Sequence, residues 1–93
     1  MSLEKPFNKE AIEKIPSDQP QGYKLFDIKG DLSYVGIAKR GRINERLLEH
    51  KNNSEFNKEI IDFATKEFSS IDQAREWEEQ IIAEENPKFN KQG

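Results

Sequence analysis

Glu78 occupies the position that most restricts the chemistry of this chain. It lies within a segment whose apolar residues recur at helical spacing, namely Ile71, Ala74, Trp77, Ile81 and Ile82. A carboxylate on an apolar helix face costs several kcal/mol when nothing compensates its charge. A bound metal ion would supply that compensation, and so would a salt bridge to Arg46 or to a lysine. The sequence alone allows both.

Arg46 and His50 form a second pair of candidates, because residues four positions apart lie on one face of a helix. A guanidinium group can clamp a phosphate through its planar fork, and an imidazole can relay a proton near neutral pH. The structural alternative pairs Arg46 with Glu45 or Glu49 and packs His50 at the end of the helix. The spacing does not decide between them.

The supply of metal ligands is narrow. The chain has no cysteine and His50 is its only histidine, which excludes disulfides, thiolate zinc sites and multi-histidine sites. Any metal must therefore be held by oxygen. One carboxylate with several waters suits Mg²⁺, or the similar ion Mn²⁺.

Positive charge is concentrated in one segment, which contains Lys39, Arg40, Arg42, Arg46 and Lys51. Only Glu45 and Glu49 oppose it there, whereas residues 55–85 are rich in Asp and Glu. The net charge of −3 argues mildly against a nucleic-acid ligand, but the distribution of charge favours a basic patch on an acidic body. In the simpler alternative these charges only solvate two helices.

The 93 residues fit one domain with a modest core, since chains of this size bury about 60–70% of their unfolded surface. No apolar run approaches the roughly 20 residues needed to cross a bilayer. A cytoplasmic protein without membrane contact is therefore expected. Residues 1–21 hold three of the four prolines. Residues 1–19 predict a lead-in with one short helix capped by Asn8, and residues 20–93 predict the domain itself.

The pattern Tyr-Lys-Leu-Phe-Asp-Ile, a Lys29-Gly30 turn and Leu-Ser-Tyr-Val-Gly-Ile predicts a β-hairpin. In that register Tyr23 lies opposite Gly36 and shares its sheet face with Tyr34, about 7–8 Å away. A three-residue loop would shift the register by one and separate the tyrosines to opposite faces. Aromatic pairs on hairpins are usually core residues, so the tyrosines alone do not indicate a site.

Three further elements follow the hairpin. Residues 43–51 predict a helix with Ile43 and Leu47 inward, and residues 55–68 predict a short helix followed by a strand. Ser70 with Gln73 forms a capping box that begins the last helix, which Asn86-Pro87 ends. The predicted fold is α/β, with a small three-stranded antiparallel sheet flanked by helices.

Five motifs occur in an order and spacing that resemble the GIY-YIG nuclease superfamily. They are Gln21-Gly22-Tyr23, Tyr34-Val35-Gly36, Arg46-Leu-Leu-Glu-His50, Glu78, and Asn86-Pro-Lys-Phe-Asn90. The resemblance spans about residues 20–90. The superfamily includes incision subunits of bacterial excision repair, intron-encoded homing endonucleases and some restriction enzymes.

The resemblance implies a role for each matched residue. Tyr23 and Tyr34 would face the scissile phosphate, Arg46 would contact it, and His50 stands where the family carries His or Tyr. Glu78 would be the single metal-binding carboxylate. Asn90 would buttress the site.

The implied activity is metal-dependent hydrolysis of DNA phosphodiester bonds by a one-metal mechanism, with a targeting protein or DNA-binding partner because no separate DNA-reading module fits in the chain. A tyrosine base, Tyr23 by preference, would need its pKa lowered from about 10 by a metal ion and an arginine. The alternative is a GIY-YIG-like module that binds nucleic acid or protein without cutting. Gln21 in the first motif and Ile37, where a polar or basic residue often stands, favour that alternative.

The basic segment generates a first prediction. Replacing Arg40 and Arg42 with Ala should weaken DNA binding about equally across sequences, and each lost phosphate contact should reduce the salt slope by about one. Fluorescence anisotropy over a salt series measures this. An unchanged slope would remove the segment from the interface.

Overall fold

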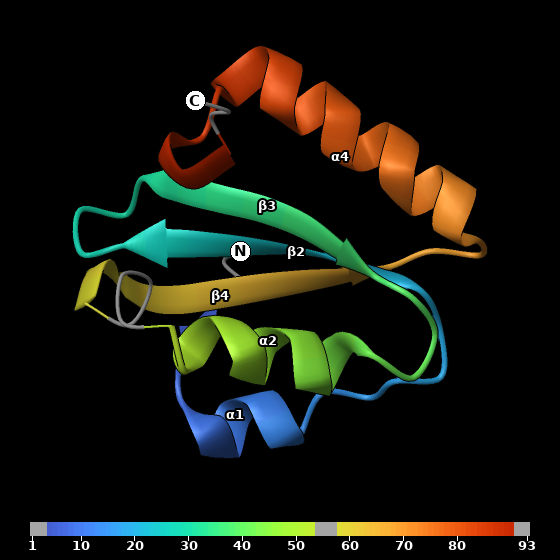
Figure 1. The fold of residues 1–93 in the computed structure, drawn as a ribbon, viewed down its shortest axis with the longest axis horizontal. Helices are drawn as coiled ribbons and strands as arrows, with labels where there is room; N and C mark the ends of the chain where they lie inside the picture. Colours follow the sequence, from blue (N-terminus) through green and yellow to red (C-terminus); the bar gives the residue numbers. More distant parts are fainter. Residues whose placement is uncertain (1–3, 54–57, 91–93) are drawn as a thin grey trace.

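The computed structural model describes residues 4–53 and 58–90, and it places a single antiparallel sheet between helices (Figure 1). The described elements are, in chain order, β1 (Lys5–Pro6), α1 (Lys9–Glu13), β2 (Gln21–Asp27), β3 (Leu32–Ala38), α2 (Ile43–Lys51), β4 (Ile60–Glu67), α4 (Ile71–Glu85) and the 3₁₀ turn η1 (Lys88–Asn90). The sheet order is β1-β4-β2-β3, so β2 is central.

The predicted α/β class is confirmed, but the prediction of three strands is wrong. A fourth strand, β1, pairs with β4 through Lys5 opposite Phe63 and Pro6 opposite Asp62. Two residues leave no alternation to detect in the sequence. Proline is tolerated there because β1 is an edge strand, where the missing N–H breaks no ladder.

Helices cover both faces of the sheet. Helices α2 and α1 pack on the face that carries Tyr23 and Leu25, and their buried residues include Ile12, Ile43 and Leu47. Helix α4 runs along β3 (Figure 1) and packs on β3 and β2.

The predicted register of the hairpin is confirmed, since Tyr23 pairs with Gly36 and Leu25 with Tyr34. The predicted loop is wrong. Three residues, 28–30, form it, with Gly30 at φ 84° and a Gly30 N–H to Asp27 carbonyl bond of 2.9 Å. This shifts the register by one, and a bulge then restores it.

The bulge lies in β3. Leu25 pairs with Tyr34 whereas Phe26 pairs with Leu32, which leaves Ser33 as one extra residue. The longer loop and the extra residue shift the register in opposite directions, so both tyrosines remain on one face of the sheet.

Helix α2 and strand β4 agree with their predictions. Ile43 and Leu47 are fully buried, and β4 pairs with β2 along its length. The short helix predicted before β4 lies largely outside the described residues.

Helix α4 begins and ends where its capping residues predict. The Ser70 side chain accepts from the Gln73 N–H at 3.2 Å, the Gln73 side chain accepts from the Ser69 N–H, and Asn86 ends the helix in the left-handed region at φ 47°. Its apolar stripe is only half-buried, apart from Ala74, because among the described elements α4 packs mainly on β3 and β2.

The segment predicted as a lead-in contributes to the fold. Asn8 caps α1 by accepting from the Ala11 N–H at 2.8 Å, and Phe7, Ile12 and Ile15 join the core. A boundary at residue 20 stays a prediction. In the described part of the chain, no helix is long and apolar enough to cross a membrane.

Gly22 provides a test of how α4 packs on the sheet. A Cβ at this position would lie 2.2 Å from Cζ3 of Trp77, so Gly22→Ala should force the indole to move and cost about 1–3 kcal/mol of stability. In a Trp77→Leu background the penalty should largely vanish. Urea denaturation of the four proteins measures it, and equal penalties in both backgrounds would contradict the packing.

Candidate active site

Tyr23 and Tyr34 project from neighbouring strands onto the same sheet face, with ring centroids 6.1 Å apart. Tyr23 is fully buried, and its phenol lies over Gly36, where an added Cβ would come within 2.5 Å of the ring and the hydroxyl. Glycine is therefore required opposite Tyr23. Any side chain there would displace the phenol.

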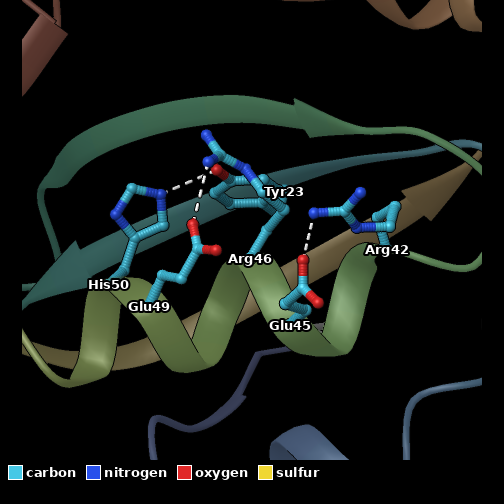
Figure 2. A network of polar contacts seen from close by, with 6 residues as sticks. All are labelled: Tyr23, Arg42, Glu45, Arg46, Glu49 and His50. Atoms are coloured by element: carbon cyan, nitrogen blue, oxygen red, sulfur yellow. Dashed lines mark hydrogen bonds and ion pairs between the residues drawn. The ribbon is translucent and has the colours of Figure 1, made fainter.

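His50 joins the two tyrosines from helix α2. Its Nε2 lies 2.8 Å from the Tyr23 hydroxyl (Figure 2). Its ring centroid lies 4.9 Å from that of Tyr34. Burial and the nearby Arg46 lower the pKa of His50, so the ring is neutral at pH 7. A neutral ring with its proton on Nδ1 accepts the Tyr23 hydroxyl proton at Nε2.

Arg46 lies one helical turn before His50, and Figure 2 shows its guanidinium beside the Tyr23 hydroxyl. Its charge acts to lower the pKa of both tyrosines, but burial acts more strongly and raises the pKa of each. Arginine alone therefore does not produce the lowered tyrosine pKa expected from the sequence. The guanidinium also pairs with Glu49 at 3.0 Å.

Glu78 is half-buried on α4, and its charge raises the pKa of Tyr34, which places the two groups near each other. Burial raises the pKa of Glu78, Glu79 adds to this effect and Arg75 opposes it. Within residues 4–53 and 58–90 no side chain forms an ion pair or hydrogen bond with this carboxylate, and Arg46 pairs with Glu49 instead. The salt-bridge alternative is thus absent from the described residues.

The donor set around Glu78 fits a hard divalent cation. Among the described residues no three His, Cys, Asp or Glu side chains gather closely enough to hold an ion by themselves. An ion at Glu78 would have one protein carboxylate and would complete its shell with water and substrate oxygens, as Mg²⁺ commonly does.

Asn90 contacts backbone rather than the reacting region. Its Oδ1 accepts from the Val35 N–H at 2.8 Å and its Nδ2 donates to the Val35 carbonyl at 2.9 Å. The side chain thus acts as a partner for the outer edge of β3, next to Tyr34. We assign it a positioning role.

The structure brings together only part of the predicted basic patch. Lys39, Arg42 and Arg46 line a cavity of about 270 Å³ between the end of β3 and the first turns of α2 and α4. Arg40 is exposed and does not line it. Lys51 lies at the opposite end of α2, with its Nζ 5.6 Å from the Phe7 ring centroid.

Two further residues that line this cavity were not predicted to do so. Arg75 lines it from α4, and its place three residues before Glu78 is the only sequence signal that could have identified it. Ile37, noted as a departure from the family pattern, lines the same cavity from β3.

Solved structures of the GIY-YIG N-terminal endonuclease domain of UvrC from Thermotoga maritima share this fold. The magnesium-bound structure is 26% identical with a TM-score of 0.74, and the match covers 90% of this chain and 100% of that chain. A Tyr-to-Phe variant bound to the catalytic divalent cation is 27% identical with a TM-score of 0.73, covering 91% and 100% of the two chains. An Asn-to-Ala variant, also cation-bound, is 26% identical with a TM-score of 0.72, covering 88% and 97%.

These structures confirm the resemblance inferred from the five motifs, and their catalytic cation is magnesium, as predicted. No family model and no curated protein matches the chain.

The unpaired Glu78 generates a stability prediction. The fold raises the pKa of Glu78 above its ordinary value of 4.5. At pH values above this raised pKa the carboxylate is ionised and destabilises the metal-free fold. Below pH 4.5 the group is protonated in both the folded and the unfolded chain, and the effect is absent. Glu78→Gln and Glu78→Ala should therefore be as stable as the wild type or slightly more stable at pH 7, with the gain of the isosteric Gln variant vanishing at pH 4.

Thermal melts with and without Mg²⁺ measure this. Mg²⁺ should raise the melting temperature of the wild type and of neither variant. A metal-independent loss of about 3–5 kcal/mol in Glu78→Ala would instead identify half of a buried ion pair and overturn the assignment.

Proposed function

We propose that this protein is a metal-dependent endonuclease that hydrolyses DNA phosphodiester bonds with one divalent cation. The observation that carries the proposal is the 2.8 Å contact between the Tyr23 hydroxyl and a neutral His50, beside Arg46. The unpaired Glu78 lies near enough to Tyr34 for its charge to raise the pKa of that phenol. Such a set can move a proton, bind a phosphate and hold a cation.

Glu78 would hold the cation, which when bound neutralises charge on the leaving oxygen. Arg46 would bind the phosphate. Its pair with Glu49 is half-exposed, with side-chain exposures of 40% and 52%. Such helix pairs are worth only about 0.3–0.5 kcal/mol, so a phosphate can replace the carboxylate with little loss. The guanidinium then stabilises the charge that grows on the phosphate in the transition state.

Tyr23 and His50 would act together as the base. Because burial raises the pKa of Tyr23, its phenolate is scarce in the metal-free protein. The hydroxyl can instead take a proton from the attacking water while it passes its own proton to His50 Nε2. A positioned relay of this kind contributes about 10²–10⁴-fold.

Tyr34 would orient the phosphate from the edge strand, and Asn90 would hold that strand through Val35. Lys39, Arg40, Arg42 and Lys51 stay predicted contacts to the DNA backbone. DNA structure or a partner protein would direct the cut.

A second candidate is a module that binds nucleic acid or protein without cutting. The raised pKa of Tyr23 and the apolar Ile37 beside Arg46 favour it. Both candidates predict binding, and only the first predicts cleavage.

Plasmid nicking separates the candidates. With Mg²⁺ the wild type should nick supercoiled plasmid, Glu78→Ala should not, and Tyr23→Phe should lose about 10²-fold or more. Anisotropy in EDTA should show that both variants still bind DNA. Binding without wild-type nicking would establish the second candidate.

The pH profile tests the relay. The pKa of His50 lies below its ordinary value of 6.5, so the ring stays neutral to a lower pH than a free imidazole. The acid limb of the kcat/KM profile should therefore lie below pH 6.5. In His50→Gln the rate should fall and this acid limb should move to lower pH. An unchanged profile in that variant would exclude His50 from proton transfer.

A further inference from the structure

The cavity beside Arg46 is lined by apolar and by positively charged side chains. Ile37, Ala38 and Ile71 provide apolar surface, and four cations surround it, namely Lys39, Arg42, Arg46 and Arg75. Its volume of about 270 Å³ is close to the lower end of the range for small-molecule sites, about 300–1,000 Å³. It therefore has room for one small ligand with a flat apolar part and a negative part.

The three arginines form ion pairs in which a phosphate can replace the carboxylate. Each pairs with a carboxylate three positions away on its own helix, and none of these carboxylates lines the cavity; the pairs are Arg42–Glu45, Arg46–Glu49 and Arg75–Asp72. Exposed helix pairs contribute little, so an incoming phosphate can displace the carboxylates. A bidentate phosphate contact is the stronger of the two interactions.

The apolar wall is what distinguishes this cavity from a simple phosphate patch. The backbone of a paired duplex offers phosphates and sugars to a protein surface, and needs no apolar recess. A base that has left the stack does need one, because its faces must be covered by apolar or aromatic groups. Arg46 lines this cavity and also lies beside Tyr23 in the candidate active site, so the two regions adjoin (Figure 2).

Resting on the proposed function, we infer that the cavity binds one unpaired nucleotide next to the scissile phosphate. Its base lies against Ile37 and Ile71, and its phosphate lies on Arg75 and Arg42. The substrate class is DNA with an unpaired nucleotide at the cut, as in a bulge or a flap. Ile37, which the family pattern alone would count as a loss, becomes a determinant of this specificity.

The test compares a linear DNA duplex carrying one bulged nucleotide with the fully paired duplex of the same length. Cleavage with Mg²⁺ and binding in EDTA are measured for wild type, Arg75→Gln, Ile37→Thr and Arg40→Gln. Ile37→Thr keeps the branching at Cβ but removes the terminal methyl group and places a hydroxyl where the apolar wall had a methylene. Arg40→Gln is the matched control, because Arg40 belongs to the same basic segment and does not line the cavity.

The wild type should prefer the bulged DNA by about tenfold or more in both measurements. In Arg75→Gln and Ile37→Thr that ratio should fall toward one. In Arg40→Gln both DNAs should be bound more weakly with the ratio kept.

Equal binding of the two DNAs by the wild type would overturn the inference, even with cleavage intact. A preference that survives both cavity variants would overturn it as well. If cleavage fails but the preference in EDTA is present and is lost in both cavity variants, the inference stands and the proposed cleavage falls.

Discussion

The close approach of Tyr23 to Gly36 is the contact on which the rest of the site depends. A Cβ at Gly36 would come within 2.5 Å of the phenol, so only glycine lets Tyr23 lie across β3. From that position the hydroxyl reaches His50 at 2.8 Å and ties the central strand to α2. The same register places Tyr34 beside the pair, on a strand whose outer edge Asn90 holds. The pairing of β2 with β3 therefore determines how Tyr23, Tyr34 and His50 come together from three separate elements.

This register could be predicted from the sequence, although the loop that produces it could not. Alternation of apolar residues fixes which side chains must face the core, and that requirement constrains Tyr23 and Leu25 whatever the loop length. The structure meets it with a three-residue loop and an extra residue at Ser33. Helix ends were equally predictable, because Ser70 and Asn86 act on their own backbone neighbours. A local pattern predicts well where the physical cause is local.

The remaining features depend on contacts between segments far apart in the chain. Strand β1 exists only because β4 offers it an unpaired edge, and two residues carry no pattern of their own. Arg75 and Lys39 come from different elements and meet only around a cavity of the folded chain. The basic segment reads as one patch in sequence, yet a helix turns its charges in different directions, and Lys51 packs on Phe7 instead. Spacing predicted the partners of Arg46 only as a set of options, among which Glu49 is the one observed.

Electrostatics links the buried site to its ligands. Burial raises the pKa of Tyr23, Tyr34 and Glu78 and lowers that of His50, so each of these four shifts disfavours the charged form. A phosphate that enters this region adds negative charge, which Arg46 compensates only in part. A divalent cation at Glu78 would compensate the carboxylate and the phosphate together. Each ligand therefore improves the site for the other, and because coupling between two binding equilibria is reciprocal, the cation should raise DNA affinity by the same factor by which DNA raises affinity for the cation.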